Sequence, residues 1–292
     1  MAILRTENLS YLYSVGTPFE TAAIKDVTIA IEPGEIVAVI GHTGSGKSTL
    51  IQHFNGLLRA NEGTVYFEEK DIWENKSKIR GVRFKVGLCF QYPEYQLFEE
   101  DVYKEIAFGP KQMGLSDEEV KQRVLSALDY VGIKRATLKK SPFDLSGGQK
   151  RRVAIAGILA MEPEVLILDE PTAGLDPRGR DMVLELIRQY QHEKKNTVIL
   201  VSHSMEDVAK LADRVLVMNN AGAAMFGTVP EVYSRGDELE KMGLNVPEIT
   251  RIFMRLRNEK GIDCRTDIFD IEQARQEVLR LLSQRKKKGE KA

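Results

Sequence analysis

The sequence predicts an α/β fold, in which short buried strands alternate with amphipathic helices. Three observations support this prediction. Residues 35–40 are an apolar run rich in β-branched residues, typical of a buried strand, and a glycine-rich loop and a helical segment follow. Residues 164–168 and 196–201 are two further apolar runs, each ending in polar side chains. Residues 101–132 and 150–160 carry apolar side chains at helical spacing.

The composition is that of a globular protein without a nucleic-acid partner. The 292 residues are enough for one large or two modest domains with a full core, and they are 42% hydrophobic and 29% charged. A net charge of −1 gives no basic field to attract nucleic acid. Cys89 and Cys264 lack metal-ligand spacing, which favours a reducing compartment. No stretch approaches the roughly 18 apolar residues of a membrane span, so we expect any membrane role to depend on a partner at the cytoplasmic side.

The central motif is the stretch 41–49, which has the spacing G-x-x-x-x-G-K-[ST]. Its backbone N–H groups and the N-terminus of a helix over 50–56 are expected to hold phosphate, with glycines allowing the loop to close tightly. Lys47 should reach the β- and γ-phosphates, and the Ser48 hydroxyl should bind Mg²⁺. A chance glycine-rich turn is disfavoured because both flanks fit. The predicted nucleotide-binding residues here are Gly41, His42, Thr43, Gly44, Ser45, Gly46, Lys47, Ser48 and Thr49.

The segment before this loop predicts a small antiparallel sheet over residues 3–40, with another strand at 63–67. Tyr11 and Tyr13 lie on it. A flat aromatic ring can stack on a purine, although the pattern alone favours core packing for both tyrosines.

Residues 145–149, with the sequence Leu-Ser-Gly-Gly-Gln, precede the helix predicted over 150–160. Glycines and a serine at a helix N-terminus can hold an anion, but five such letters alone are weak support. The basic residues 150–152 predict a solvent-exposed first turn. Farther upstream, Ser116 and Glu119 predict a capping box, followed by Val120 and Val124 on a core face.

Acidic side chains follow the strand predicted over 164–168. Because ligands bind at the carboxyl ends of parallel strands, Asp169 is expected to hold Mg²⁺ and Glu170 to address a water molecule. A purely structural helix cap is disfavoured, since the strand over 196–201 ends similarly, in Ser202 and His203. His203 could donate to a phosphate oxygen. The other histidines are interpreted as ordinary: His42 as a variable loop position, and His53 and His192 as helix-surface positions.

The C-terminal part predicts a hairpin over 213–229 and then helices over 247–256 and 271–282. The basic stretch 285–288 is expected to be disordered.

Together these motifs resemble the ATP-binding-cassette family. The match spans roughly residues 1–235 in a specific order: the loop 41–49, Gln91 after a strand, Leu145–Gln149, Asp169 with Glu170, and His203. The resemblance implies a RecA-like core, an antiparallel β subdomain and a helical subdomain at about 95–160. Residues 236–292 would then be a helical extension that serves dimerisation and ends in the basic tail.

The resemblance also implies roles for residues at a composite site. Tyr13 matches the position that stacks on adenine, with Tyr11 as the fallback, and Gln91 matches a ligand of the metal and a catalytic residue. Glu170 matches the general base, assisted by Lys47 and His203. ATP would lie between two cassettes arranged head to tail, the second contributing Ser146 and Gly148. Residues 173–176 match the loop that crosses between cassettes, although Ala173-Gly174 replaces its usual small hydroxyl residue.

Residues 91–110 are similar to the ATPases of energy-coupling factor importers, and Tyr-Pro-Glu after Gln91 resembles the second of their two ATPase types. This implies an importer of a vitamin or transition-metal ion, working at the cytoplasmic face of the cell membrane as a peripheral subunit. The expected partners are a second ATPase subunit, an integral membrane coupling protein and a substrate-binding membrane protein. The alternative function is that of an ATPase subunit in another transporter of the family, or of a soluble cassette ATPase in DNA repair or translation. One cassette, no long heptad run and no basic stripe argue against the soluble roles.

A regulatory cassette that does not hydrolyse ATP would be expected to lack Glu170 or His203, and both are present. A kinase is disfavoured by residues 145–149 together with His203.

Overall fold

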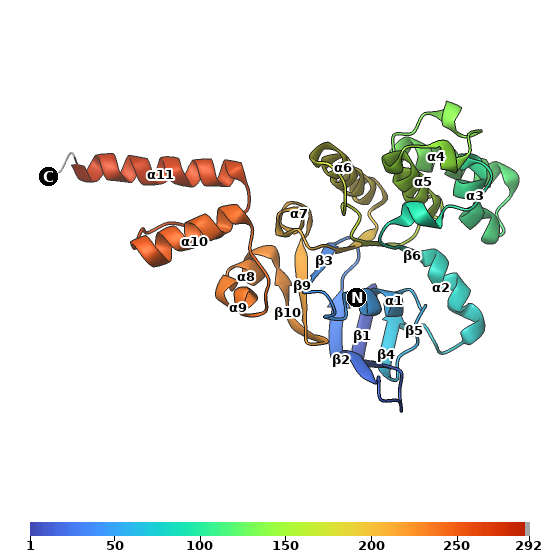
Figure 1. The fold of residues 1–292 in the computed structure, drawn as a ribbon, viewed down its shortest axis with the longest axis horizontal. Coiled ribbons are helices and arrows are strands. Elements are labelled where there is room, and N and C mark those ends of the chain that lie inside the picture. The colour runs from blue at the N-terminus through green and yellow to red at the C-terminus, as the bar shows by residue number, and fades with distance from the viewer. Residues whose placement is uncertain (290–292) are drawn as a thin grey trace.

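The computed structural model describes residues 1–289, which form two β-sheets, a lobe of helices and a C-terminal helical extension (Figure 1). The larger sheet has the strand order β10-β9-β3-β8-β7-β6. All its strands run parallel except β10, which pairs antiparallel with β9 at one edge. They are β3 (Ile36–Ile40), β6 (Val86–Cys89), β7 (Val165–Asp169), β8 (Thr197–Val201), β9 (Arg214–Asn219) and β10 (Gly222–Thr228).

The parallel strands are mostly apolar on both faces, as expected for a sheet that is covered on both sides. Leu166 and Leu168 of β7 belong to the core that includes helix α6 (Pro177–Lys194). Their neighbours Val165 and Ile167 belong to a second core, which includes helix α1 (Lys47–Phe54). Helix α7 (Met205–Leu211) contributes to a third core with β9.

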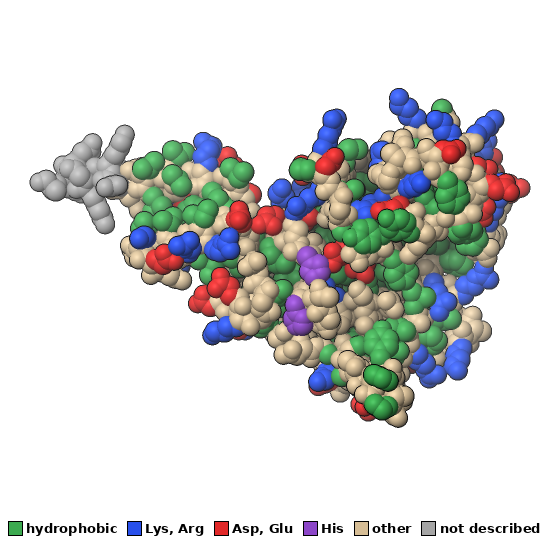
Figure 2. Space-filling model, viewed as in Figure 1, with side chains coloured by type: hydrophobic (Ala, Val, Ile, Leu, Met, Phe, Trp, Pro, Cys, Tyr) green, Lys and Arg blue, Asp and Glu red, His purple; other side chains and the backbone are tan. Residues whose placement is uncertain are grey.

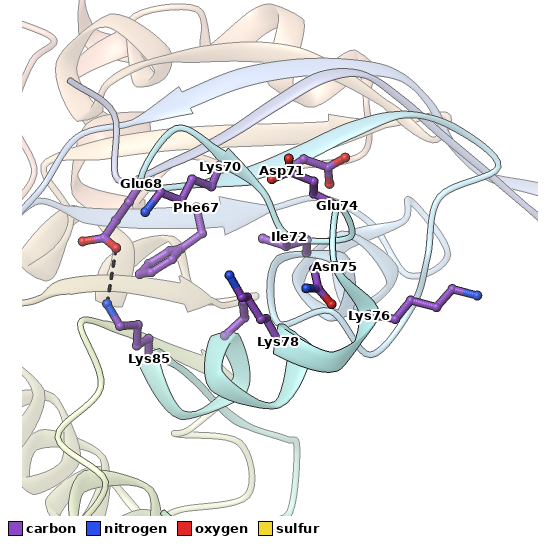
Figure 3. Close-up of a pocket in the computed structure, with 11 residues that line it drawn as sticks. Phe67, Glu68, Lys70, Asp71, Ile72, Glu74, Asn75, Lys76, Lys78 and Lys85 are labelled. Atoms are coloured by element: carbon purple, nitrogen blue, oxygen red, sulfur yellow. Dashed lines mark hydrogen bonds and ion pairs between the residues drawn. The ribbon is translucent and has the colours of Figure 1, made fainter.

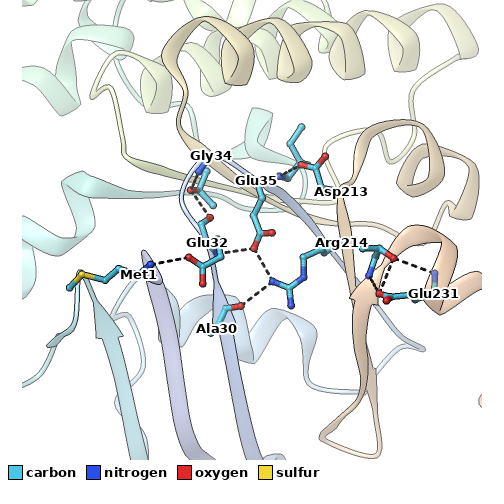
Figure 4. A network of polar contacts seen from close by, with 11 residues as sticks. Met1, Ala30, Glu32, Gly34, Glu35, Asp213, Arg214 and Glu231 are labelled. Carbon is cyan, nitrogen blue, oxygen red and sulfur yellow. Dashed lines mark hydrogen bonds and ion pairs between the residues drawn. The ribbon is translucent and has the colours of Figure 1, made fainter.

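The smaller sheet is antiparallel, as predicted, with the order β2-β1-β4-β5. Its strands are β1 (Leu4–Tyr13), β2 (Thr21–Ile31), β4 (Glu62–Phe67) and β5 (Lys70–Asp71). A polar network joins it to the larger sheet (Figure 4). Arg214 donates to the Ala30 carbonyl and to the Glu35 carboxylate, each at 3.3 Å, while Asp213 accepts from the N–H of Ile36 at 2.8 Å. The start of β3 is therefore fixed against both β2 and β9.

The helical lobe lies beyond β6 (Figure 1). Its helices are α3 (Val102–Gln112), α4 (Asp117–Tyr130) and α5 (Gly147–Leu159), whereas α2 (Ile79–Lys85) lies beside β5 and packs on the core that includes α1. The capping box predicted at Ser116 and Glu119 is present, and Val120 and Val124 are fully buried.

The C-terminal extension projects away from this lobe (Figure 1). It follows α8 (Val229–Tyr233) and contains α9 (Gly236–Lys241), α10 (Glu248–Lys260) and α11 (Ile271–Gly289). Helix α11 extends into the basic stretch 285–288, and the disorder expected for this tail stays a prediction. Lys and Arg are good helix formers and no glycine interrupts the helix before residue 289. Within residues 1–289, no helix is both long and apolar enough to cross a bilayer.

Candidate functional site

One open cavity of about 490 Å³ brings together residues from six separate segments of the chain. It lies where β3, β6, β7 and β8 end, the edge at which open α/β sheets bind ligands. Its lining contains most of the predicted site residues, namely Tyr13, Thr43, Gly44, Gly46, Lys47, Ser48, Thr49, Gln91, Asp169, Glu170 and His203. The predicted residues Gly41, His42 and Ser45 belong to the same loop but do not line the cavity.

The glycine-rich loop is held tightly against neighbouring strands. Gly46 has φ 102°, and a Cβ there would lie 2.2 Å from the Ala23 carbonyl oxygen. A Cβ on Gly41 would lie 2.4 Å from the Met218 carbonyl oxygen. Only glycine fits at either position. Helix α1 begins at Lys47, earlier than predicted, so its first N–H groups, which have no partner within the helix, face the cavity.

Lys47 is buried, and its Nζ donates to the carbonyl oxygens of Gly41 and His42 at 2.7 and 3.0 Å. Burial lowers the pKa of this lysine, while Glu170 and Asp169 oppose the shift. The ammonium group is thus held inside the loop, where an anion would be its natural partner.

Ser48 and Asp169 meet in this cavity, with Ser48 Oγ donating to Asp169 Oδ2 at 3.1 Å. Burial raises the pKa of Asp169. Hydroxyl and carboxylate oxygens are ligands that suit Mg²⁺, which usually takes only one or two carboxylates and completes its shell with water and phosphate. The described residues contain no group of three or more His, Cys, Asp or Glu side chains that could hold a metal ion.

Glu170 and His203 form the other polar pair, with Glu170 Oε1 2.7 Å from His203 Nε2. Glu170 has φ 50°, and its N–H donates to the Val201 carbonyl at 3.0 Å, which ties the end of β7 to the end of β8. Burial raises the pKa of Glu170, although the charge of a protonated His203 lowers it. A carboxylate with a raised pKa beside a histidine is suited to accept a proton.

Ser146 and Gly148 lie elsewhere. They border a separate cavity of about 130 Å³, whose lining shares no residue with the first. Ser146 is the N-cap of α5, accepting from the N–H of Gln149, and both Ser146 and Gly148 are exposed. Within one chain these residues do not join the phosphate-binding loop.

Two cavities of similar size to the first lie outside this site. A groove of about 500 Å³ runs between the helical lobe and β6, with the exposed rings of Phe98 and Phe108 in its lining. A cavity of about 550 Å³ lies among β4, β5 and α2 (Figure 3). Lysines and acidic residues alternate in its lining, so its charge favours neither anions nor cations.

Two residues at the site were misjudged from the sequence. His53, interpreted as a surface position, is fully buried in α1. His53 lies three residues after the apolar Leu50, which places the two on the same face of α1, and this spacing was the available signal. Arg151, expected in an exposed first turn, is 3% exposed and pairs with Glu94. No local pattern indicates that pairing.

Comparison with known proteins gives the same picture over nearly the whole chain. A family model described as "ABC transporter" matches residues 24–173. The energy-coupling factor transporter ATP-binding protein EcfA2 of Clostridium acetobutylicum is 56% identical over 97% of this chain and 99% of its own length. The protein of that name from Caldanaerobacter subterraneus is 52% identical over 96% and 97%.

Solved structures are also similar. The structure of cbiO1 from Clostridium perfringens, part of the ABC transporter complex cbiONQ, has a TM-score of 0.74 and 40% identity, covering 87% of this chain and 99% of that one. The cassette MJ0796, as a dimer bound to ADP and Pi, has a TM-score of 0.70 and 26% identity, covering 77% and 98%.

Proposed function

Since the chain belongs to the ATP-binding-cassette family, as an ATPase of the energy-coupling factor type, we propose that its ATP hydrolysis drives uptake of a vitamin or a transition-metal ion. The observation that carries the proposal is the single cavity that holds the phosphate-binding loop, Asp169, Glu170 and His203 together.

ATP is proposed to bind with its phosphates on the loop 41–49 and its adenine against Tyr13. Lys47 would exchange its bonds to loop carbonyls for bonds to the β- and γ-phosphates. Ser48, Asp169 and Gln91 would hold Mg²⁺, whose bound form neutralises charge on the phosphate oxygens. Glu170 would accept the proton of the attacking water, and His203, 2.7 Å away, would orient Glu170 and donate to the γ-phosphate.

The working unit is proposed to be a head-to-tail pair of ATPase subunits, in which the partner supplies Ser146 and Gly148. Two features support this arrangement: these residues lie outside the cavity of their own chain, and they are exposed. ATP then bridges two subunits, and hydrolysis removes the bridging contacts, so the two nucleotide states favour different arrangements.

The C-terminal extension is proposed to hold this pair together. Figure 2 shows hydrophobic side chains grouped over α10 and α11. Exposed apolar residues there include Ile252, Ile271, Leu279 and Leu282. The occupant we propose is the matching helix pair of a second ATPase subunit, which by resemblance is a different chain, because apolar faces of similar shape can cover each other.

The membrane partner is proposed to dock in the groove lined by Phe98 and Phe108. An apolar helix of an integral membrane coupling protein fits an exposed aromatic groove of this size. The substrate-binding membrane protein would join through that coupling protein. The ATPase would therefore act as a peripheral subunit at the cytoplasmic face, without nucleic acid.

The test is a purified complex of this chain with its co-purifying subunits. Ser146→Arg should abolish ATP hydrolysis at the site that contains the partner's phosphate-binding loop while leaving ATP binding intact, because the large side chain blocks the partner's γ-phosphate site. Asp144→Arg is the matched control, since Asp144 is also exposed but lies outside both linings. Full turnover by Ser146→Arg would reject the head-to-tail site.

A further inference from the structure

His53 lies in the helix that follows the phosphate-binding loop, and its ring is completely buried. Its Nδ1 is 2.8 Å from the carbonyl oxygen of Thr49. A carbonyl oxygen only accepts, so Nδ1 carries the proton. Burial lowers the pKa of His53, which favours the neutral ring. Its Nε2 has no hydrogen-bond partner among the described residues. A hydrogen bond therefore accounts for the position of only one of the two ring nitrogens, Nδ1.

The rest of the His53 ring contacts aromatic neighbours. The Tyr11 ring meets it at a centroid distance of 4.8 Å and an angle of 70°. Tyr11 in turn meets Tyr13 at 4.9 Å and 90°. Both are edge-to-face arrangements, which aromatic quadrupoles favour. Three rings thus connect the inside of α1 with the wall of the nucleotide cavity.

Tyr13 also contacts helix α1 directly. The Tyr13 hydroxyl is 3.3 Å from Thr49 Oγ1, and Thr49 is also the residue whose carbonyl holds His53. Tyr13 itself is 40% exposed and lines the cavity. Its ring is therefore an exposed side chain attached at two points to the helix that carries Lys47 and Ser48.

We propose that His53 is a positioning residue for the base of the nucleotide: acting through Tyr11, it fixes the ring of Tyr13 in the orientation that stacks on adenine. This rests on the proposed function, since it requires ATP to bind with its base against Tyr13. An exposed tyrosine loses rotamer freedom when a ligand orders it, and holding the ring in place beforehand removes that cost. The base would then contribute more to affinity than an unsupported ring allows.

The competing explanation is that His53 only stabilises α1 and hence the phosphate-binding loop. The two explanations differ in which part of the nucleotide responds to substitution. A defect in the loop weakens the binding of every triphosphate, with or without a base. A defect in the orientation of Tyr13 weakens the binding only of ligands that carry the base.

The experiment compares calorimetric dissociation constants of ATP and inorganic tripolyphosphate for the full chain. The variants are His53→Leu, Tyr13→Ala and the double substitution, with Tyr11→Leu as a second way to break the ring series. Leucine suits the apolar site of His53 and removes both ring nitrogens, including the unpartnered Nε2. We expect His53→Leu and Tyr11→Leu to weaken the affinity for ATP by about threefold to tenfold and to leave the affinity for tripolyphosphate unchanged. The double variant should bind ATP no more weakly than Tyr13→Ala, because His53 acts through Tyr13.

The outcomes separate the two levels of the proposal. If Tyr13→Ala leaves ATP affinity unchanged, the assignment of adenine to Tyr13 has failed, and the role of His53 fails with it. If Tyr13→Ala weakens ATP but His53→Leu does not, only the role of His53 is overturned. The role of His53 would also be overturned if His53→Leu lost affinity for tripolyphosphate as well as for ATP, or if the effects of the two substitutions on ATP affinity added up in the double variant.

Discussion

Arg151 and Glu94 form a bidentate ion pair inside the protein, with Nε–Oε2 and Nη2–Oε1 distances of 3.0 and 2.8 Å. Arg151 also donates to the carbonyl oxygens of Pro171 and Ala173, at 3.3 and 2.6 Å. One guanidinium therefore joins α5, the loop after Gln91 and the loop after Glu170. These segments carry Ser146, part of the apolar groove and the proposed base, so the hydrogen bonds of Arg151 hold these three sites in a fixed arrangement.

Arg151→Met should destabilise the protein by about 3–5 kcal/mol, because it leaves the Glu94 carboxylate unpaired where it is 15% exposed. Two carbonyl groups would also lose their donor. The free energy of unfolding from urea titration would measure the effect. Arg255→Met is the matched control, since its ion pair with Glu259 is exposed, and we expect no measurable change there. Equal stability of the two variants would contradict the structural role of the buried pair.

Glu170→Gln should reduce phosphate release from the site that contains this chain's loop by about 10²–10⁴-fold, the range that general-base catalysis contributes. The amide has nearly the same shape but cannot accept the proton of the attacking water. ATP affinity should remain, because Glu170 is not one of the phosphate-binding groups. Glu185→Gln, on the exposed face of α6, should have no effect on either quantity. Turnover by Glu170→Gln close to that of the wild type would reject Glu170 as the base.

The pH profile of turnover follows from the same carboxylate. A base must be ionised, so activity should fall as the pH drops through the pKa of Glu170. Burial raises that pKa, which places the acidic limb at higher pH than an ordinary glutamate would give. A protonated His203 lowers the Glu170 pKa, so His203→Gln should move the limb to still higher pH. His192→Gln, on the surface of α6, is the control. A limb that stays in place in His203→Gln would argue against Glu170 as the titrating group.

The parts of the site that could be predicted were those encoded in consecutive residues. The loop 41–49 and the ends of the apolar runs at Asp169 and His203 are local patterns, and parallel pairing of β7 and β8 then brings their ends together. This meeting of the strand ends does not depend on the exact register or twist, because all buried parallel strands end at the same edge of the sheet.

His53 and Arg151 could not be predicted, for a different reason. Their burial depends on partners distant in sequence, Tyr11 for one and Glu94 for the other. A basic residue in the first turn of a helix is normally solvated, and only the loop after β6 folding onto α5 removes it from water.

The groove beside the helical lobe gives the last prediction. Phe98 and Phe108 meet edge to face with centroids 5.0 Å apart, and they remain 58% and 42% exposed. Exposed aromatic pairs of this kind are typical anchors for a partner helix. The double substitution Phe98→Ser and Phe108→Ser should therefore release the chain from the membrane fraction of expressing cells, with ATP affinity unchanged. Phe19→Ser is the control, since Phe19 is 81% exposed but lies between β1 and β2, away from the groove. Sedimentation with membranes at the wild-type level would show that the partner docks elsewhere, while loss of ATP affinity would show that the substitutions damage the fold instead.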